Sequence, residues 1–372
     1  MFIKDLTNNI EEDRSVFIYC HDDTDGNGSC SIIYEMYKNL GIDTEYIEHE
    51  EIDYTKNINP NMFDENDIVY FVDYSFSKKS NVEALITLVK NIECKVVWID
   101  HHKSSLDLIN SGEIESIKCN SNFLYFINTE YCATVLCYVF AKYIISNANL
   151  NVNSININIS DIDYNVYTLD MSSLPLVIQY IDSYDTWKHN KENTIEFIYG
   201  VTSSGITPDT FMSIAVNSNN KCIFDNVMCD RYVDRCINAG KKIKKYLDNN
   251  NKKLSSKNGF EFKIIFNNIT YYCYALNTVG NSTVFGDLFD EYDIVCPFSY
   301  NGQMYKYSLF TSKEDIECDI IAKHLGSIDG LGGGGHRKAA GFQTLEQILG
   351  DGYTLRIKKK LFGSRYKVQI DW

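Results

Sequence analysis

Several features of specialised protein classes are missing from this sequence. No run approaches the ~20 consecutive apolar residues that a membrane-spanning helix needs. The 12 Cys are scattered between Cys20 and Cys318 without a CxxC pair, which argues against a paired-cysteine metal site and a disulfide framework. The segment Met1–Arg14 is polar and acidic and does not resemble a signal peptide. We therefore expect a cytoplasmic protein with no membrane partner, whose cysteines are reduced and mostly buried.

An excess of basic residues is also missing. Lys and Arg number 35 against 50 Asp and Glu, which gives a formal net charge of −15 at pH 7. Such a charge repels the phosphate backbone, whereas proteins that hold long nucleic acids usually present a basic face. Cations bound at an acidic site are expected to cancel part of the charge. We therefore expect no long duplex as a partner.

The length and the apolar pattern predict an α/β protein with more than one domain. At 372 residues the chain exceeds what a single hydrophobic core usually holds. The runs Val16–Cys20, Ile68–Val72 and Val96–Ile99, the last within a predicted strand Lys95–Ile99, are short and apolar, as buried parallel strands are. Helices are predicted between them, the first from Gly28 to Leu40, and Thr44–Ile47 is predicted as a short strand. Strand and helix in alternation indicate a parallel sheet with right-handed crossovers.

Each of the three apolar runs is followed by acidic residues or histidines. The first is followed by the segment His21–Gly26, which contains Asp23 and Asp25, the second by Asp73, and the third by Asp100, His101 and His102. A single Asp at such a turn is more often a helix cap, but ligands of open α/β sheets bind beyond the carboxyl ends of the strands. Oxygen and imidazole ligands together suit Mn²⁺ or a similar divalent ion. The pattern therefore predicts a metal site at this edge of the sheet.

The middle of the chain is predicted to be mainly helical. A buried helix is predicted from Tyr131 to Ile145, followed by an Asn-rich insertion or loop at 147–165. The next helix begins near Ser172 and runs to Asp182, and Asp185 lies three residues on, so both carboxylates can share one face. A polar helical connector follows, and we expect it to be interrupted at Asn249–Asn251 and at Ser255 and Ser256.

The last part of the sequence contains strands and an unusual run of glycines. Hairpins are predicted at Asn267–Asn268 and at Asn301–Gly302, and a helix from about Asp319 to Leu325. The run Gly332–Gly335 precedes His336, Arg337 and the segment Lys338–Phe342. Alone it would indicate a flexible turn. Without Cβ atoms, its N–H groups can approach an anion, and a helix beginning after it would add a positive end. We expect phosphate to bind there.

Together these motifs resemble the DHH phosphoesterase family with its DHH-associated C-terminal domain. The order is His-x-Asp-x-Asp-Gly at His21, a strand-end Asp73, the Asp100–His102 triplet, the helix with Asp182 and Asp185, and Gly-Gly-Gly-Gly-His-x-x-Ala-Ala-Gly-Phe. Several dispersed motifs in one order are far more specific than a glycine loop alone. Within the family, the sequence is most similar to the NrnB-type oligoribonucleases and related small-oligonucleotide phosphodiesterases.

The resemblance implies roles for the matching residues. His21, Asp23 and Asp73 would bind one Mn²⁺, and Asp25, Asp73, His101 and a helix carboxylate would bind a second. Asp182 and Asp185 both fit that last role. The metals would be Mn²⁺, with Mg²⁺ or Co²⁺ as alternatives. His102 would face the substrate phosphate and Asp100 would orient the imidazoles.

The substrate would be held by the glycine-rich segment. Its members in this role are Gly332, Gly333, Gly334, Gly335, His336 and Arg337. The sequence departs from many relatives at Ser308–Thr311, where it has Phe310 and no Arg. An aromatic ring there could stack on a base.

The activity implied is hydrolysis of short oligonucleotides to nucleoside monophosphates by a water activated between two metals. The partner would be a short single-stranded oligonucleotide or a small nucleotide. The alternatives are hydrolysis of a signalling nucleotide, such as a cyclic dinucleotide, its linear product or a 3′-phosphorylated adenosine nucleotide, and a catalytically silent nucleotide-binding protein. The sequence leaves the oligomeric state open, a homodimer included.

The resemblance also implies the domain plan. A parallel-sheet DHH catalytic domain is expected at 1–189, a helical linker at 190–256, and a smaller mixed-sheet α/β DHH-associated domain for substrate binding at 257–372.

Overall fold

The computed structural model describes residues 3–7, 14–54, 56–148, 157–205, 207–208, 226–359 and 366–371. The chain divides into two compact units, Met1–Ile243 and Lys244–Trp372, and each is described by itself. Among the described residues, no helix combines the length and the apolar character needed to cross a membrane. The domain boundaries expected at 189/190 and 256/257 remain a prediction.

The first unit is built on a five-stranded sheet in the order β2-β1-β3-β4-β5. All neighbouring strands are parallel, as predicted. The strands are β1 (Val16–His21), β2 (Ile47–Ile52), β3 (Ile68–Val72), β4 (Lys95–Asp100) and β5 (Phe123–Ile127). Every residue of β3 is buried, because helices cover both faces of a parallel sheet.

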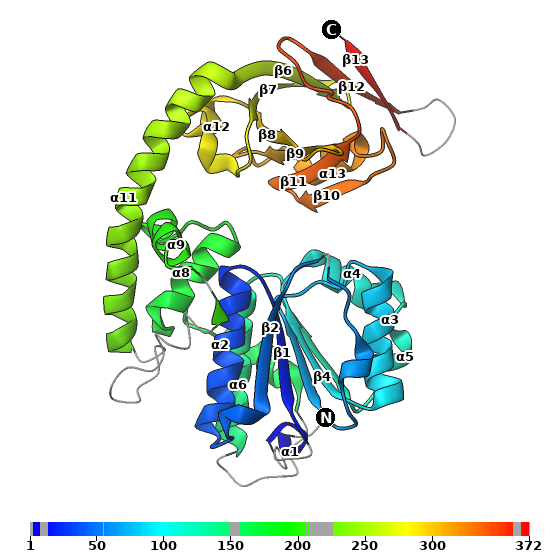
Figure 1. The fold of residues 1–372 in the computed structure, drawn as a ribbon, viewed down its shortest axis with the longest axis vertical. Helices are drawn as coiled ribbons and strands as arrows, with labels where there is room; N and C mark the ends of the chain where they lie inside the picture. The colour runs from blue at the N-terminus through cyan, green and yellow to red at the C-terminus, as the bar shows by residue number, and fades with distance from the viewer. Residues whose placement is uncertain are drawn as a thin grey trace. The chain divides into compact units, whose positions relative to one another are not determined.

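Two helical layers enclose this sheet (Figure 1). On one face lie α2 (Thr24–Asn39) and α6 (Ala133–Ala148), which pack against each other and share a core with the sheet. On the other face, a second core holds α3 (Lys79–Thr87), α4 (Lys103–Ser111) and α5 (Glu115–Lys118). The sheet therefore has two buried faces, and its ends are the places where polar residues can gather.

The first unit contains further helices besides those of the two layers. The short ones are α1 (Ile3–Thr7), η1 (Thr44–Tyr46), η2 (Pro60–Met62), the π-helix η3 (Leu88–Ile92) and η4 (Met171–Ser173). The longer ones are α7 (Ile159–Tyr167), α8 (Leu176–Asp185), α9 (Thr194–Thr202) and α11 (Asn226–Asn258), the last of which continues into the second unit. Residues 149–156 of the expected Asn-rich insertion, and 206 and 209–225 of the expected linker, lie outside the described residues.

Several element boundaries differ from those predicted. Helix α2 begins at Thr24 rather than Gly28, because the Asp23 side chain caps it by accepting hydrogen bonds from the N–H groups of Asp25 and Gly26. Strand β2 begins at Ile47, after a 3-10 turn capped by Asp43. The sheet also has a strand, β5, that was not predicted from the sequence.

The expected interruption near residue 250 is wrong, because α11 continues to Asn258. Its polar side chains bond back to the preceding turn, as Asn249 does to the Lys245 carbonyl. Near the end, Leu254 packs against an apolar cluster, and the Tyr274 hydroxyl donates to the Ser255 carbonyl at 3.0 Å. These tertiary contacts outweigh the low helix propensity of Asn and Ser.

The second unit is an eight-stranded mixed sheet in the order β10-β11-β9-β8-β7-β6-β12-β13. Its strands are β6 (Gly259–Phe266), β7 (Ile269–Asn277), β8 (Ile294–Tyr300), β9 (Tyr305–Phe310), β10 (Gly333–His336), β11 (Ala339–Thr344), β12 (Thr354–Lys359) and β13 (Tyr366–Asp371). Pairing is antiparallel except for β7 with β8 and β6 with β12. Its helical elements are η5 (Ser282–Phe285), α12 (Leu288–Glu291) and α13 (Cys318–Leu325), the last of which contributes to the main core. The α/β fold, with a parallel and a mixed sheet, is as predicted.

The glycine run forms a strand, and no helix begins after it, which corrects the prediction. Gly333–His336 pairs with β11 in an antiparallel hairpin. The turn is tied down, because the carbonyls of Arg337 and Lys338 accept hydrogen bonds from the N–H groups of Cys318 and Thr311. At Gly335 the φ angle is 141°, and a Cβ would come within 3.0 Å of Ala339 and Ala340. Glycine is therefore required there to close the hairpin.

Candidate metal centre

The carboxyl ends of β1, β3 and β4 deliver the predicted side chains to one edge of the parallel sheet. His21 is the last residue of β1, Asp73 follows β3, and Asp100 ends β4. Helix α2 starts immediately beyond β1, so a Cβ at Gly26 would come within 3.0 Å of the His21 backbone. Only glycine permits that close approach, and it brings Asp25 on α2 to the same edge.

One group of candidate ligands consists of His21, Asp23 and Asp73. One ligand atom from each lies within 4.8 Å of the others. The His21 Nδ1 atom is 3.0 Å from Asp23 Oδ2 and 3.9 Å from Asp73 Oδ2. An imidazole and two carboxylates thus face a common point.

A second group consists of Asp25, His101 and Asp185, again with ligand atoms within 4.8 Å of one another. The His101 Nε2 atom lies 3.1 Å from Asp185 Oδ2, 3.8 Å from Asp25 Oδ2 and 3.3 Å from Asp73 Oδ1. Asp73 therefore faces both groups, with one carboxylate oxygen toward His21 and the other toward His101.

Asp73 is held in an unusual backbone conformation. Its φ angle is +54°, a region that Asp and Asn enter more readily than other non-glycine residues. Its N–H donates to the carbonyl of Ile99 at 2.9 Å, so the chain turns sharply as it leaves β3. The side chain is only 1% exposed. The sheet thus places a buried carboxylate between two imidazoles.

The Asp25 carboxylate is fixed by the first turn of α6. Its two oxygens accept hydrogen bonds from the N–H groups of Ala133 and Thr134, at 2.7 and 2.8 Å. The Thr134 hydroxyl also donates to the Asp25 carbonyl at 2.9 Å. A carboxylate at a helix N-terminus is favoured by the helix dipole, so Asp25 is oriented by α6.

The two carboxylates of α8 differ in their surroundings. Asp182 accepts from the Cys132 N–H at 3.0 Å and from Lys188 Nζ at 3.1 Å. Lys188 Nζ also donates to the Glu130 carbonyl at 2.6 Å. Asp185 instead points at His101, and its Oδ2 is buried without a hydrogen-bond donor. The structure therefore places Asp185 with the candidate ligands and Asp182 in a neighbouring polar contact.

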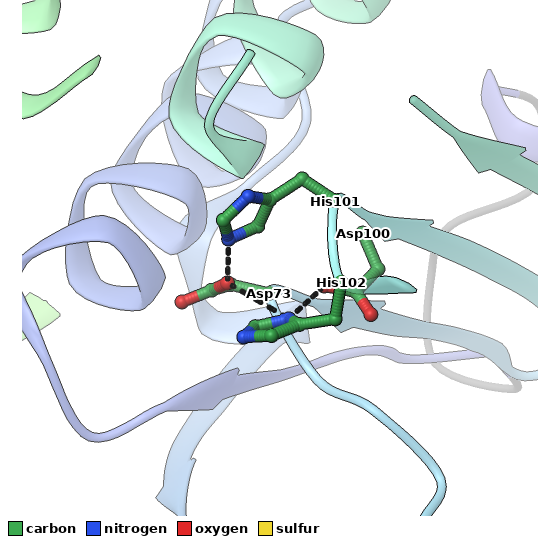
Figure 2. Close-up of side chains that lie close together, drawn as sticks. All are labelled: Asp73, Asp100, His101 and His102. Carbon is green, nitrogen blue, oxygen red and sulfur yellow. Dashed lines mark hydrogen bonds and ion pairs between the residues drawn. The ribbon is translucent and has the colours of Figure 1, made fainter. Parts of the chain in front are cut away.

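The other histidine of the triplet is oriented by Asp100 (Figure 2). His102 Nδ1 donates to Asp100 Oδ1 at 2.8 Å, and the Ser105 hydroxyl donates to Asp100 Oδ2. Burial opposes ionisation of Asp100, but the charge and hydrogen bond of His102 hold its pKa below the usual value. In turn, burial opposes protonation of His102, while Asp100 raises its pKa. Its Nε2 atom lies 3.5 Å from the Tyr54 hydroxyl.

The electrostatics of the cluster fit divalent cations. Burial, followed by the charges of neighbouring Asp25 and Asp23, raises the pKa of Asp73 well above its usual range. Burial and the charge of Asp25 do the same for Asp185. Asp73 Oδ1 and Asp185 Oδ2 are buried and accept no hydrogen bond from any of the described residues. Buried carboxylates are costly unless they are paired or coordinate a metal, and this mixture of oxygen and imidazole donors suits Mn²⁺-like ions.

The glycine-rich segment lies in the second unit. Gly333–His336 forms β10, an edge strand of its sheet. Around Gly334 a Cβ would meet nothing within 4 Å. Arg337 is 58% exposed, with its Nε 4.0 Å from Glu317. Phe310 is partly buried against the cluster of Leu276, Phe285 and Val295.

Several residues around the candidate metal centre were not predicted from the sequence. Tyr54, whose ring centroid lies 4.6 Å from that of His21, follows a strand with no motif that would mark it. The N–H groups of Cys132, Ala133 and Thr134 carry no side-chain signal at all. Lys188 pairs with Asp182, six residues earlier, from a position beyond the end of α8, so helical spacing does not mark it either.

Comparison with known proteins gives a family match for the first part of the chain. Residues 15–161 match the model of the DHH family, N-terminal domain. No curated protein sequence matches the chain.

Solved structures resemble the chain at low sequence identity. A DHH domain from a protein described as a member of a family of ribosomal proteins has a TM-score of 0.52 and 16% identity, over 89% of this chain and 83% of that one. RecJ from Thermus thermophilus, in complex with Mn²⁺, has a TM-score of 0.46 and 11% identity, over 88% of this chain and 49% of its own. The pGpG-specific phosphodiesterase PggH from Vibrio cholerae has a TM-score of 0.40 and 14% identity, over 89% and 93% of the two chains.

The first of these likenesses shows the fold, and the family match coincides with the parallel sheet. Residues 15–161, which contain His21, Asp73 and the triplet Asp100–His102, thus match the DHH family N-terminal domain in sequence, on a fold shared with a solved DHH domain.

Proposed function

We propose that this protein is a divalent-metal-dependent phosphodiesterase that hydrolyses short oligonucleotides to nucleoside monophosphates. The observation that carries the proposal is the position of Asp73, which faces His21 with one oxygen and His101 with the other. One carboxylate that faces two ligand groups could contact two cations at once, and two cations held close together can stabilise both the attacking and the leaving oxygen at phosphorus.

The proposed ligands divide between two cations. His21, Asp23 and Asp73 would hold one, and Asp25, Asp73, His101 and Asp185 the other. Cations held there would lower the pKa of water and would stabilise the charge that develops at phosphorus. We propose Mn²⁺ as the physiological ion, because imidazole nitrogens disfavour Mg²⁺.

The protein's own side chains would orient the reaction. Asp25 is fixed by two N–H groups of α6, so it needs little rearrangement to act as a ligand. His102 is held by Asp100 and would donate a hydrogen bond to the scissile phosphate. Asp182 would support the neighbouring backbone rather than act as a ligand, since its Oδ2 is paired with the Lys188 ammonium and it is not a member of the candidate ligand groups among the described residues.

We propose that the glycine-rich strand binds the distal part of the substrate. Because β10 ends the sheet, one of its sides is not covered by another strand of the described chain, and N–H groups of edge strands can bind added partners. Gly332–Gly335, His336 and Arg337 would take this role. The domain plan proposed with it is catalysis by 1–189, a linker at 190–256 and substrate binding by 257–372.

The proposal is tested by comparing cleavage of end-labelled oligonucleotides of increasing length, cyclic dinucleotides, their linear products and a 3′-phosphorylated adenosine nucleotide. We expect Mn²⁺-dependent release of nucleoside monophosphate, fastest for the shortest oligomers. Faster hydrolysis of a signalling nucleotide would redirect the assignment to that substrate.

Variants separate catalysis from silent binding. We expect Asp73→Asn and His101→Ala each to lower the cleavage rate by more than the about 10–100-fold that loss of an outer partner of a metal ligand costs. Asp107→Asn, at an exposed position of α4, should retain full activity. A wild-type protein that binds nucleotide with Mn²⁺ yet releases no product would contradict the proposal and identify a sensor.

A further inference from the structure

A cavity of about 360 Å³ opens beside the candidate metal centre in the first unit. We propose that it is a subsite for the base and sugar of the nucleotide whose phosphate lies at the metal centre. This inference rests on the proposed function and adds to it the part of the substrate that determines recognition. The volume falls within the range of about 300–1,000 Å³ typical of small-molecule sites.

One side of the cavity is apolar and aromatic. It is lined by Ile181 and Tyr184 from α8 and by Ile198 and Thr202 from α9. Ile198 and Thr202 lie one turn apart, and the Thr202 hydroxyl donates to the Ile198 carbonyl at 2.8 Å. An aromatic ring and branched aliphatic side chains next to a polar rim are what a planar base needs for stacking and packing.

The other side of the cavity is strongly acidic. It is lined by Asp22, Asp23, Asp25 and Asp185, the last three being candidate metal ligands. None of the described residues that line the cavity is Lys, Arg or His. A phosphate inside the cavity would therefore find no basic side chain among these lining residues, and only cations held by the carboxylates could neutralise it. The occupant beyond the metal centre should thus be the uncharged nucleoside, with its phosphate held at the carboxylate end.

The aromatic wall is held in place before any ligand binds. The Tyr184 ring lies nearly parallel to that of Trp187, at an interplanar angle of 22° and a centroid distance of 6.4 Å. His189 meets both rings nearly edge-on. Its N–H donates to the Ser183 carbonyl at 2.9 Å, which ties the loop back to α8. A ring that is already ordered loses little entropy on binding.

The experiment compares two ligands that share a phosphate and differ by a base. Titration calorimetry in the presence of Mn²⁺ would give the Kd of adenosine 5′-monophosphate and of ribose 5-phosphate. Stacking on one aromatic ring predicts that the nucleotide binds about tenfold tighter. Thr202→Phe, at an exposed rim position, should lower this ratio by narrowing the side of the cavity where the base would lie, so that the Kd of adenosine 5′-monophosphate rises more than that of ribose 5-phosphate. Ser203→Phe, the exposed neighbour that does not line the cavity, is the matched control.

If Thr202→Phe disturbs folding, a second pair of variants tests whether the base contacts the Tyr184 ring. Tyr184→Leu should lower the ratio of the two Kd values, and Tyr184→Phe should retain it, because only the ring is required. Equal Kd values for the two ligands in the wild type, or a ratio that none of these variants changes, overturn the subsite. Failure of the proposed function is seen separately, as absence of Mn²⁺-dependent cleavage, whatever the ratio.

Discussion

At the scale of single residues, the candidate centre depends on charges that the fold buries before any cation is present. Asp73 and Asp185 have raised pKa values because burial and neighbouring carboxylates disfavour their ionised forms. A divalent cation would remove this cost, so metal binding should be linked to stability.

This linkage predicts the behaviour of Asp73→Asn. Asn tolerates the positive φ of this position and removes the charge, so the metal-free variant should be at least as stable as the wild type. With Mn²⁺ at about 100 times its Kd, the wild type should gain about 2.7 kcal/mol, and the variant should gain little. Thermal unfolding with Mn²⁺ and with a chelator measures both effects, with Asp107→Asn as control. A full Mn²⁺ gain in Asp73→Asn would argue against Asp73 as a ligand.

A matched pair on α8 distinguishes ligand from support. Asp182→Ala removes the acceptor of the buried Cys132 N–H and of Lys188, so the free energy of unfolding should fall by about 1–3 kcal/mol while stabilisation by Mn²⁺ persists. Asp185→Ala should do the reverse, because it removes a candidate ligand and relieves repulsion among carboxylates. Chemical denaturation with and without Mn²⁺ measures both quantities for each variant. If Asp182→Ala abolished the stabilisation by Mn²⁺ and Asp185→Ala retained it, Asp182 would be the ligand.

At the scale of elements, the centre is assembled where backbones come unusually close. The first turn of α2 passes the end of β1 at Gly26, and the first turn of α6 holds Asp25 through two N–H groups. Both contacts therefore need backbone groups in addition to the side chains of the candidate ligands.

Gly26→Ala should therefore disrupt the centre without removing any ligand. Its Cβ would press against the His21 backbone, and overpacking of this kind costs about 1–3 kcal/mol or more. We expect most of the stabilisation by Mn²⁺ to be lost as His21 and Asp25 move apart. Gly41→Ala is the comparison, because nothing lies within 4 Å of its Cβ and only its φ of 79° opposes the change. It should cost about 1–2 kcal/mol and keep the Mn²⁺ effect, and equal Mn²⁺ effects in the two variants would contradict the argument.

The glycine hairpin provides a test confined to the second unit. Gly335→Ala places a Cβ against Ala339 and Ala340 at a φ of 141°, so the hairpin should distort. We expect KM for a short oligonucleotide to rise while the Mn²⁺-dependent rise in Tm is unchanged, because every proposed metal ligand lies in the first unit. Steady-state kinetics and thermal unfolding measure the two quantities. An unchanged KM would remove the hairpin from the proposed substrate site.

At the scale of the whole molecule, the net charge of −15 sets how a nucleic acid can be held. Proteins that bind DNA through 6–10 phosphate contacts lose about 10³–10⁵ in affinity between 50 and 200 mM salt. Here phosphates would be met by a few cations and backbone N–H groups rather than by a basic surface. Affinity should therefore depend on the divalent ion far more than on monovalent salt.

We accordingly expect KM for a short oligonucleotide at saturating Mn²⁺ to change less than about tenfold between 50 and 200 mM KCl. Long duplex DNA should not compete measurably with the short substrate. Kinetics across a salt series, with duplex added as competitor, check both statements. A steep salt dependence would reveal a basic surface that the net charge conceals.

Much of the fold and of the candidate centre could be predicted from the sequence. The apolar runs at Val16–Cys20, Ile68–Val72 and Val96–Ile99 predict the parallel strands, because strands buried on both faces are continuous apolar runs. Since carboxyl ends of parallel strands meet at one edge, the same runs placed His21, Asp73 and His101 together. The hairpin at Asn267–Asn268 was also predictable, because Asn enters the positive-φ region more readily than most residues. Both residues adopt positive φ angles in the structure.

What only the tertiary structure decided are contacts between segments distant in sequence. Helix α11 runs through its Asn-rich stretch because Leu254 and Ser255 meet the second unit's side chains. The glycine run became a strand because β11 pairs with it. Asp182 and Asp185 were equivalent in sequence and were distinguished by their contacts with Cys132 and His101, which the fold brings to α8 from distant parts of the chain. Local sequence sets which groups a segment offers, whereas their partners, and so their charge states and roles, depend on packing.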